Sequence, residues 1–529
     1  MPEKRALLVT EGTYPYYWGG VSTWCDCLVN ELAEVDFTVL AIVERLGLPL
    51  RFTPPHNVDV RPTSIWGVRN AWEIDDVRRA RDVVRRRRRT TDRAIANGFV
   101  PSYHRFFDQL VGGERDDDAL LSALHGMYRF FEDHDFDRTL RSRQVWDVVV
   151  ERSNATFGRM ADEHGLDRHR PSAGEVAAAT QWVYHWLFPL ARALPEVDVA
   201  HATMTGISSL VCVVAQAEHG SAFLLSEHGI HLREVYLAEH GARGSLFLKL
   251  LKLGFARRTT ELAYAKADAV APCCDYNQRW ERRIGAAPDR IQTTYYGIDP
   301  RIVRPAVRDD RAERAPVVAW AGRIDPLKDV ETLLRAAAVV LIRRPDVRFH
   351  LYGNAAPGSE SYLERCLALQ ASLGLPEAVT FEGYSEDLPT VFAAADLVVL
   401  SSISEGFPYT TLEAMLCGKP IVATAVGGVR EQVSPTCGRI VRPRDPQALG
   451  EAILDIVGDE GVRDSLARGA RERAASLFTM ERFRTTHRAL YGVSGNGNGR
   501  APEALEDENE ASAGSLELSI RSVALEVHD

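Results

Sequence analysis

The chain has 529 residues, which is enough for at least two domains. Hydrophobic residues make up 45% of it and charged residues 26%, as in an ordinary soluble globular protein. The formal net charge of −10 and the isoelectric point of about 5.9 argue against nucleic acid as the main partner.

Two further features narrow the cellular setting. No apolar run reaches membrane-spanning length, and the opening Met-Pro-Glu-Lys-Arg lacks the layout of a signal peptide. The eight cysteines are scattered without any Cys-x2-Cys pair, so buried free thiols are expected in place of zinc or disulfides. A cytoplasmic protein is therefore predicted.

The amino-terminal residues predict the start of a βαβ unit. The expected elements are a strand at 5–10, a Gly-rich loop at 18–20, a helix at 21–34 and a strand at 37–43. Gly19 and Gly20 stand after a strand and before a helix, where they would let a ligand approach the backbone.

Residues 70–190 interrupt this alternation and predict a helical insertion within the first domain. The insertion contains five consecutive arginines, Arg85–Arg89. The run is typical of a solvated helix face, and the alternative is a docking site for anionic lipid or an acidic partner.

The insertion also contains three acidic motifs of the Asp-x-Asp type, at 116–118, 133–135 and 135–137. A metal-binding Asp-x-Asp motif is expected directly after a buried strand, whereas these three lie among helical, charged residues. No metal site is therefore expected.

Alternation resumes with a strand at 197–201 and another at 222–225, which leads into Ser226-Glu227-His228-Gly229. Residues 301–315 are rich in Arg, Asp, Glu and Pro and are expected to form a hinge. The segments that follow predict a second, doubly wound domain with a cleft-facing loop at Gly427-Gly428. Its expected strands and helices are 317–321, 328–343, 347–352, 360–373, 379–382, 388–395, 397–400, 410–417 and 420–424.

A pair of cations follows the first strand of this second domain. Arg323 and Lys328 lie at its carboxyl end, where open α/β sheets bind ligands. They could neutralise a leaving diphosphate without a metal. Either residue alone would more often be a surface cation in an ordinary ion pair.

The segment 404–414 reads Ser-Glu-Gly-Phe-Pro-Tyr-Thr-Thr-Leu-Glu-Ala and follows a buried strand. Gly406 and Pro408 break the chain, so Thr410 or Thr411 is expected to open a helix whose first N–H groups are free to hold a phosphate. Glu413, one turn into this helix, could accept hydrogen bonds from ribose hydroxyls. Glu405, in the loop, could reach a sugar beyond the phosphates.

The Glu-x7-Glu pattern, with Gly-Arg-x4-Lys upstream, resembles the donor site of the retaining glycosyltransferases of family 4. Residues 7–15, 19–24, 226–234 and 321–329 resemble the PelF branch of that family. The resemblance covers most of 5–45 and 195–490, is weak over 50–190 and is absent after about 492.

The resemblance implies an α/β protein of GT-B architecture, in which two Rossmann-like doubly wound domains face a central cleft. The expected organisation is a first, acceptor-side domain at 1–300, a nucleotide-sugar domain at 316–477, a helix crossing back at 478–491 and a flexible acidic tail at 492–529.

The resemblance also assigns roles to residues of this sequence. Catalytic roles fall to His228, Arg323, Lys328 and Glu405, with His228 facing the cleft near the donor sugar. The residues expected to bind the nucleotide sugar are Gly19, Gly20, Arg233, Arg323, Lys328, Gly406, Tyr409, Thr410, Thr411, Leu412 and Glu413. No cofactor or metal is implied.

The implied activity is retaining transfer of a hexose, glucose above all, from a UDP-sugar to a growing polysaccharide or another glycan acceptor. The PelF-like stretches point to exopolysaccharide synthesis at the inner face of the membrane, with separate membrane subunits as partners. Two alternatives stay open: a GT-B epimerase acting on a UDP-sugar, and a non-catalytic subunit that binds nucleotide sugars.

Overall fold

The computed structural model describes residues 4–66, 80–111, 115–164, 171–241, 244–301, 315–356 and 358–493. The hinge expected at 301–315 lies almost wholly outside these ranges. So do the tail from residue 494 onward and the start of the insertion, at 70–79.

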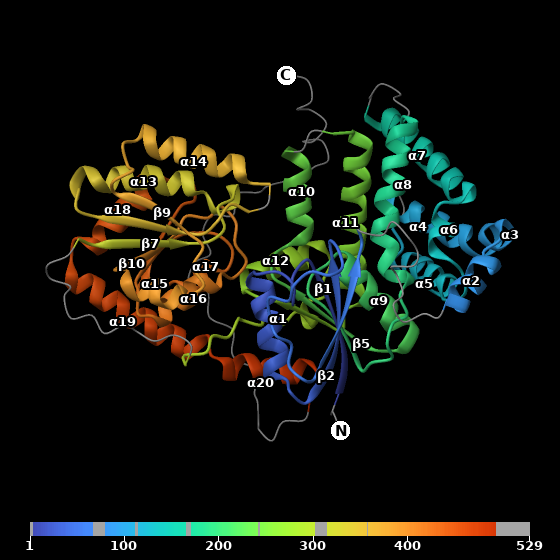
Figure 1. Ribbon diagram of the computed structural model, residues 1–529, viewed down its shortest axis with the longest axis horizontal. Coiled ribbons are helices and arrows are strands. Elements are labelled where there is room, and N and C mark those ends of the chain that lie inside the picture. Colours follow the sequence, from blue (N-terminus) through green and yellow to red (C-terminus); the bar gives the residue numbers. More distant parts are fainter. Residues whose placement is uncertain are drawn as a thin grey trace.

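Two parallel sheets, each six-stranded, form the framework (Figure 1). The first has the order β3-β2-β1-β4-β5-β6, and the second has the order β12-β11-β10-β7-β8-β9. The first-sheet strands are β1 (Lys4–Glu11), β2 (Val35–Val43), β3 (Val58–Ser64), β4 (Val199–Ala202), β5 (Ala222–Glu227) and β6 (Ala269–Pro272). The second-sheet strands are β7 (Val317–Ala321), β8 (Arg348–Tyr352), β9 (Val379–Gly383), β10 (Leu397–Leu400), β11 (Ile421–Thr424) and β12 (Gly438–Val441).

Helices connect the strands within each sheet. Those that follow first-domain strands are α1 (Gly20–Glu31), α9 (Ile207–His219), α10 (His231–Gly241), α11 (Leu246–Lys266) and α12 (Asp275–Ile284). The second domain has α13 (Val330–Arg343), α14 (Glu360–Ser372), α15 (Leu388–Ala394), α16 (Tyr409–Leu416), α17 (Val429–Gln432), α18 (Pro446–Val457) and α19 (Glu460–Leu477). The prediction of two doubly wound α/β domains in a GT-B arrangement is confirmed.

The sequence analysis did not predict the strand β3 (Val58–Ser64). It reads Val-Asp-Val-Arg-Pro-Thr-Ser and pairs only with β2, at the edge of the first sheet. Pro62 cannot donate a ladder hydrogen bond, which is tolerated at an edge but weakens the sequence signal for a strand.

Helices between β3 and β4 gather on the side of the first domain that faces away from the second (Figure 1). They are α2 (Ala80–Arg89), α3 (Asp92–Ala94), α4 (Val100–Val111), α5 (Asp117–Asp133), α6 (Phe136–Leu140), α7 (Arg143–His164) and α8 (Ala173–Leu187). Their aromatic side chains share one core with α9 and β1, in which Phe106 and Phe131 are fully buried. This burial of apolar surface holds the inserted helices against the sheet.

The arginine run lies on α2, where most of its side chains bond to neighbouring residues. Arg86 donates to the carbonyl of Phe131 at 3.0 Å, Arg87 lies 3.4 Å from Asp135, and Arg89 lies 2.6 Å from Asp133. Asp82, on the same helix, lies 3.6 Å from Arg85. The contacts of Arg86, Arg87 and Arg89 hold α2 to the end of α5 and the start of α6, whereas that of Arg85 lies within α2. Four of the five arginines thus have partners within the chain.

The last helix, α20 (Met480–Leu490), returns to the first domain and packs on α1 (Figure 1). The hydroxyl of Tyr491 lies 2.6 Å from Nδ1 of the buried His201 on β4. The backbone N–H of Ile298 donates to the carbonyl of Phe478 at 2.9 Å. One apolar core includes residues from both sheets, so the two domains make an apolar contact beside α20.

No helix in the described part of the chain combines the length and hydropathy that a membrane crossing requires.

Candidate active site

The loop after β10 ends at an open helix terminus. The helix α16 begins at Tyr409, one residue before the expected Thr410, because Pro408 occupies the N-cap directly before it. Within the described structure, no side chain caps this terminus. The first N–H groups of α16, those of Thr410, Thr411 and Leu412 among them, are therefore available to an anion.

Lys328 and Glu405 form an ion pair beside this terminus. Lys328 Nζ lies 2.6 Å from Glu405 Oε1, and the side chains are only 19% and 10% exposed. Ser402 donates its hydroxyl to the same carboxylate oxygen at 2.6 Å. The two residues meet because β7 and β10 are neighbouring parallel strands, so the loops after them share one edge of the sheet.

Hydrogen bonds hold these two loops in register. Asp325 caps the short turn Pro326–Lys328 through the N–H groups of Leu327 and Lys328. Ser401 donates to the carbonyl of Lys328 at 2.8 Å. Lys328 is therefore fixed by its backbone as well as by its ion pair, which suits a cation that must meet a charge in one place.

Two arginines approach the same loops from opposite domains. Arg323 of the second domain is 69% exposed and lies 3.6 Å from Asp325. Arg233, on α10 of the first domain, donates to the hydroxyl of Ser404 at 3.0 Å. Both arginines lower the pKa of Glu234, which burial raises. The positive charge predicted for this region thus comes from both sides of the domain contact.

Glu413 lies on α16 and is partly buried. Burial raises the pKa of its carboxyl group to about 7. Among the described residues its carboxyl group has no hydrogen-bond partner, so the carboxyl oxygens are available to donors such as ribose hydroxyls.

His228 lies directly after β5, where its ring packs in an aromatic cluster and its backbone carbonyl faces Gly406 of the second domain. Its Nδ1 lies 2.7 Å from the hydroxyl of Tyr296, and its ring centroid lies 4.6 Å from that of Trp24. Burial lowers its pKa to about 3, so the imidazole is neutral. It can therefore serve as a hydrogen-bonding group but does not add positive charge.

The Gly-rich loop of the first domain also reaches this contact. Gly19 is the N-cap of α1, and a Cβ placed on Gly20 would lie 3.8 Å from the ring of Tyr409. Tyr409 in turn stacks on Tyr296, with ring centroids 4.6 Å apart. The structure thus brings the predicted site residues to one region, where the carboxyl ends of both sheets meet.

Gly406 lies at the closest approach of the two domains. A Cβ on this residue would lie 1.9 Å from the carbonyl oxygen of His228, which no real contact allows. Its lack of a side chain thus lets the Glu405 loop meet the first domain.

The sequence analysis missed some contributors. Tyr296 stands between the two halves of the site and follows no recognisable motif. Glu431, on α17, bonds to the first domain and carries only the weak signal of a preceding Gly427-Gly428. Contacts between distant segments of this kind leave no local pattern.

The Asp-x-Asp aspartates all have structural roles far from this region. Asp116 and Asp135 cap α5 and α6 through backbone N–H groups. Ion pairs engage the others: Asp117 with Arg258, Asp118 with Lys266, Asp133 with Arg89 and Asp137 with Arg141. In the described ranges, no cluster of three or more His, Cys, Asp and Glu side chains could hold a metal ion.

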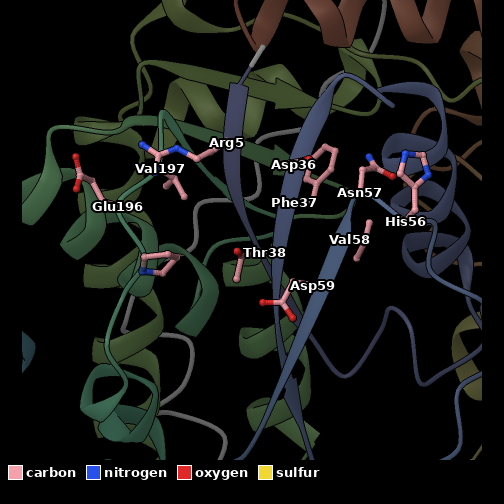
Figure 2. A pocket seen from close by; sticks show the side chains of 11 residues that line it. Arg5, Asp36, Phe37, Thr38, His56, Asn57, Val58, Asp59, Glu196 and Val197 are labelled. Atoms are coloured by element: carbon pink, nitrogen blue, oxygen red, sulfur yellow. The ribbon is translucent and has the colours of Figure 1, made fainter. Parts of the chain in front are cut away.

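A pocket of about 400 Å³ lies at the opposite, amino end of the first sheet (Figure 2). Arg5, Asp36 and Val58 line it at or near the starts of β1, β2 and β3, with His56 and Asn57 beside them. The carboxyl ends of parallel strands are the ligand-binding edge in open α/β sheets, and this pocket lies away from that edge.

Comparison with protein families identifies the chain. The family described as "Domain of unknown function (DUF3492)" matches residues 4–289, more than half of the chain. The chain belongs to this DUF3492 family. A second model, described as "Glycosyl transferases group 1", matches residues 307–473 of this DUF3492 protein, which include Arg323, Lys328, Glu405 and Glu413.

Curated relatives share part of the chain. A D-inositol 3-phosphate glycosyltransferase of Salinispora arenicola is 37% identical over 232 residues, which is 40% of this chain and 51% of the relative. One of Saccharomonospora viridis is 36% identical over 231 residues, 40% of this chain and 53% of the relative. The chain thus matches only about half the length of these relatives.

Solved structures match nearly the whole fold. A sucrose-phosphate synthase from Thermosynechococcus elongatus superposes with a TM-score of 0.59 at 18% identity, covering 93% of this chain and 98% of that one. The Anabaena protein Alr3699/HepE, in complex with UDP and glucose, gives a TM-score of 0.56 at 16% identity over 93% and 100%. At these identities the likeness establishes the GT-B fold.

Proposed function

We propose that this chain is a retaining glycosyltransferase that moves a hexose, glucose in the first instance, from a UDP-sugar to a growing polysaccharide or another glycan. The observation that carries the proposal is the Lys328–Glu405 pair, 2.6 Å apart, beside the uncapped start of α16. It puts a cation and free N–H groups for a diphosphate next to a carboxylate for sugar hydroxyls. The group 1 domain, and the glycosyltransferase names of the relatives, support the reaction class.

The chemistry follows from where charge develops. As the bond between sugar and diphosphate breaks, negative charge grows on the diphosphate and positive charge grows on the sugar ring. Lys328, Arg323 and the first N–H groups of α16 stabilise the former. Glu405 orients the hydroxyls of the sugar, and the departing phosphate takes the proton of the acceptor on the same face. Close contact of the two domains excludes water, which would otherwise hydrolyse the donor.

The direct test is incubation of the purified protein with UDP-, GDP- and ADP-sugars, followed by measurement of nucleotide release and sugar products. We expect UDP release from UDP-glucose, by transfer to added glycans or by slow hydrolysis. A sugar that changes configuration without lasting UDP release would point to an epimerase. Binding without turnover of any donor would point to a nucleotide-sugar-binding subunit.

Turnover is expected to need no divalent metal. Lys328, Arg323 and the start of α16 supply positive charge at the diphosphate, and the Asp-x-Asp aspartates cap helices or form ion pairs. Excess EDTA should leave the rate of UDP release within about twofold of its untreated value. A loss of activity that Mn²⁺ or Mg²⁺ restores would contradict this expectation.

The two glutamates are expected to affect different steps. Glu413→Ala should weaken UDP binding, since ribose contacts are the same in the ground and transition states, whereas Glu405→Ala should mainly lower kcat.

Because the pKa of Glu413 is about 7, wild-type UDP binding should tighten as the pH rises from 6 to 8 and the carboxylate forms. Glu413→Gln should flatten this pH dependence. Calorimetry with UDP alone measures the affinity for UDP and its pH dependence, and steady-state kinetics measures kcat. Loss of UDP binding in Glu405→Ala but not in Glu413→Ala would mean that the two glutamates have the opposite roles.

The resemblance of residues 7–15 and 226–234 to the PelF branch supports a place in exopolysaccharide synthesis at the inner face of a membrane. Under this proposal, separate membrane subunits would export the product. Co-purification of such subunits with the tagged protein from its native cells would test the assignment, and their consistent absence would count against it.

A further inference from the structure

Glu431 of the second domain bonds to the start of a first-domain helix. Its two carboxylate oxygens accept the backbone N–H groups of Asp275 and Tyr276, each at 2.8 Å, at the beginning of α12. The hydroxyl of Tyr295, also in the first domain, lies 3.0 Å from both Glu431 Oε2 and Asp275 Oδ2, and its one proton can bond to either carboxylate. A carboxylate at a helix N-terminus is stabilised by the free N–H groups and by the helix dipole.

The backbone around Glu431 supports the loop that carries Glu405. The N–H of Gly428 donates to the carbonyl of Gly406 at 2.8 Å, and a Cβ on Gly427 would lie 1.8 Å from the carbonyl oxygen of Glu405. The side chain of Gln432 donates to the carbonyl of Pro408, the N-cap of α16, at 3.1 Å. The short helix α17 thus contacts the Glu405 loop and the start of α16 as well as α12.

The helix α19 also holds the backbone of α17 in place. Arg473 on α19 donates to the backbone carbonyls of Glu431 and Gln432, at 2.7 and 2.8 Å. The backbone at Glu431 is therefore held rigidly within the second domain, while its carboxylate reaches into the first.

We propose that Glu431 is a positioning residue: its carboxylate docks the second domain on α12 and thereby sets the Glu405 loop and the start of α16 against the first domain. The proposal rests on the function proposed above for that site. The carboxylate of Glu431 bonds to α12, and its effect on the site comes through the loop that α17 supports. Loss of its acceptor oxygens would free the two domains to separate.

The groups around the carboxylate make this docking dependent on pH. Burial above all, and to a lesser extent the neighbouring carboxylate of Asp275, raises the pKa of Glu431. The N–H groups of α12 and the Tyr295 hydroxyl oppose this, and the net pKa is about 7. Arg473 faces it only through bonds to backbone carbonyls. An undocked, exposed carboxyl group would have an ordinary, lower pKa, so docking favours the protonated form and should weaken as the pH rises through about 7.

The test compares wild type with Glu431→Gln, which keeps the size but puts an NH2 group against backbone N–H donors. Glu451→Gln is the matched control, because Glu451 pairs with Arg343 on the exposed surface of the second domain. Small-angle scattering without nucleotide should give a larger radius of gyration for Glu431→Gln than for wild type or the control. Wild type should expand as the pH rises from 6 to 8, whereas Glu431→Gln should be expanded throughout.

Kinetics and UDP binding together give a second readout, because a misfolded protein would lose both UDP binding and kcat. Glu431→Gln should lower kcat about tenfold or more while the Kd for UDP, measured by calorimetry, stays within about twofold. Tyr295→Phe removes a hydroxyl that can bond to Glu431 and should shift both readouts in the same direction by less, which keeps the proposal testable if Glu431→Gln fails to fold.

An unchanged radius of gyration and unchanged kcat in Glu431→Gln would overturn the proposal. A wild type that neither binds UDP nor releases it from UDP-sugars would refute the proposed function instead. The scattering comparison needs no nucleotide and would still decide the role of Glu431.

Discussion

Lys328→Ala is expected to lower kcat/KM for the UDP-sugar by about 100-fold or more. A fixed cation on a developing charge contributes on the order of 2.7–4 kcal/mol in a site that excludes water. Lys328 meets that description, because its side chain is 19% exposed and its ammonium lies 2.6 Å from Glu405. Removal of Lys328 also takes away the ion pair of the Glu405 carboxylate, which is 10% exposed. The hydrogen bond from Ser402 to that carboxylate remains. Steady-state kinetics of UDP release measures the effect.

Two companion variants sharpen this result. Arg323→Ala should lower kcat/KM by more than about tenfold but less than Lys328→Ala, because its side chain is 69% exposed and water screens its charge. Lys252→Ala is the matched control, since Lys252 forms a similar ion pair with Glu239 at 2.8 Å on the first domain. Wild-type kinetics in both Lys328→Ala and Arg323→Ala would rule out this donor site.

Gly406→Ala is expected to lower kcat by about 100-fold while sparing the second domain. The added Cβ would lie 1.9 Å from the carbonyl oxygen of His228, so the domains could not reach their observed contact. Gly406 does not need the left-handed backbone region, since its φ lies outside the positive range, so the substitution adds little local strain. The nucleotide-binding residues of the second domain should stay in place, and the Kd for UDP should change by less than about threefold.

The measurement pairs calorimetry with UDP and single-turnover kinetics with the UDP-sugar. Gly174→Ala on α8 is the control, because a Cβ there meets only the hydroxyl of Ser172, at 3.9 Å. Normal turnover in Gly406→Ala would show that this domain contact is not part of the catalytic state.

Much of the fold was predictable because its signals are local. Buried apolar runs such as Leu397–Leu400, each followed by a helical pattern, predict parallel strands with crossover helices, and the structure confirms this. The Arg323–Lys328 and Glu405–Glu413 segments were placed at strand ends by the same reasoning. Their meeting, with Lys328 on Glu405, follows from the pairing of β7 with β10, which the order of strands along the chain does not reveal.

What the sequence could not predict depends on contacts between distant residues. The Arg85–Arg89 run looks like an isolated basic patch until Asp133 and Asp135 are seen beside it. Likewise, no periodicity links Glu431 to Asp275, more than 150 residues earlier. The domain contact, which carries the proposals made for Gly406 and Glu431, therefore had to come from the structure.

The most direct test of the proposed activity is proton NMR of a reaction of wild-type protein with UDP-α-glucose and a glycan acceptor. We predict that UDP and an α-configured glycoside will appear together, and that Lys328→Ala will produce neither at a comparable rate. A β-configured product, a donor sugar altered without UDP release, or an inert mixture in the presence of bound donor would contradict the account.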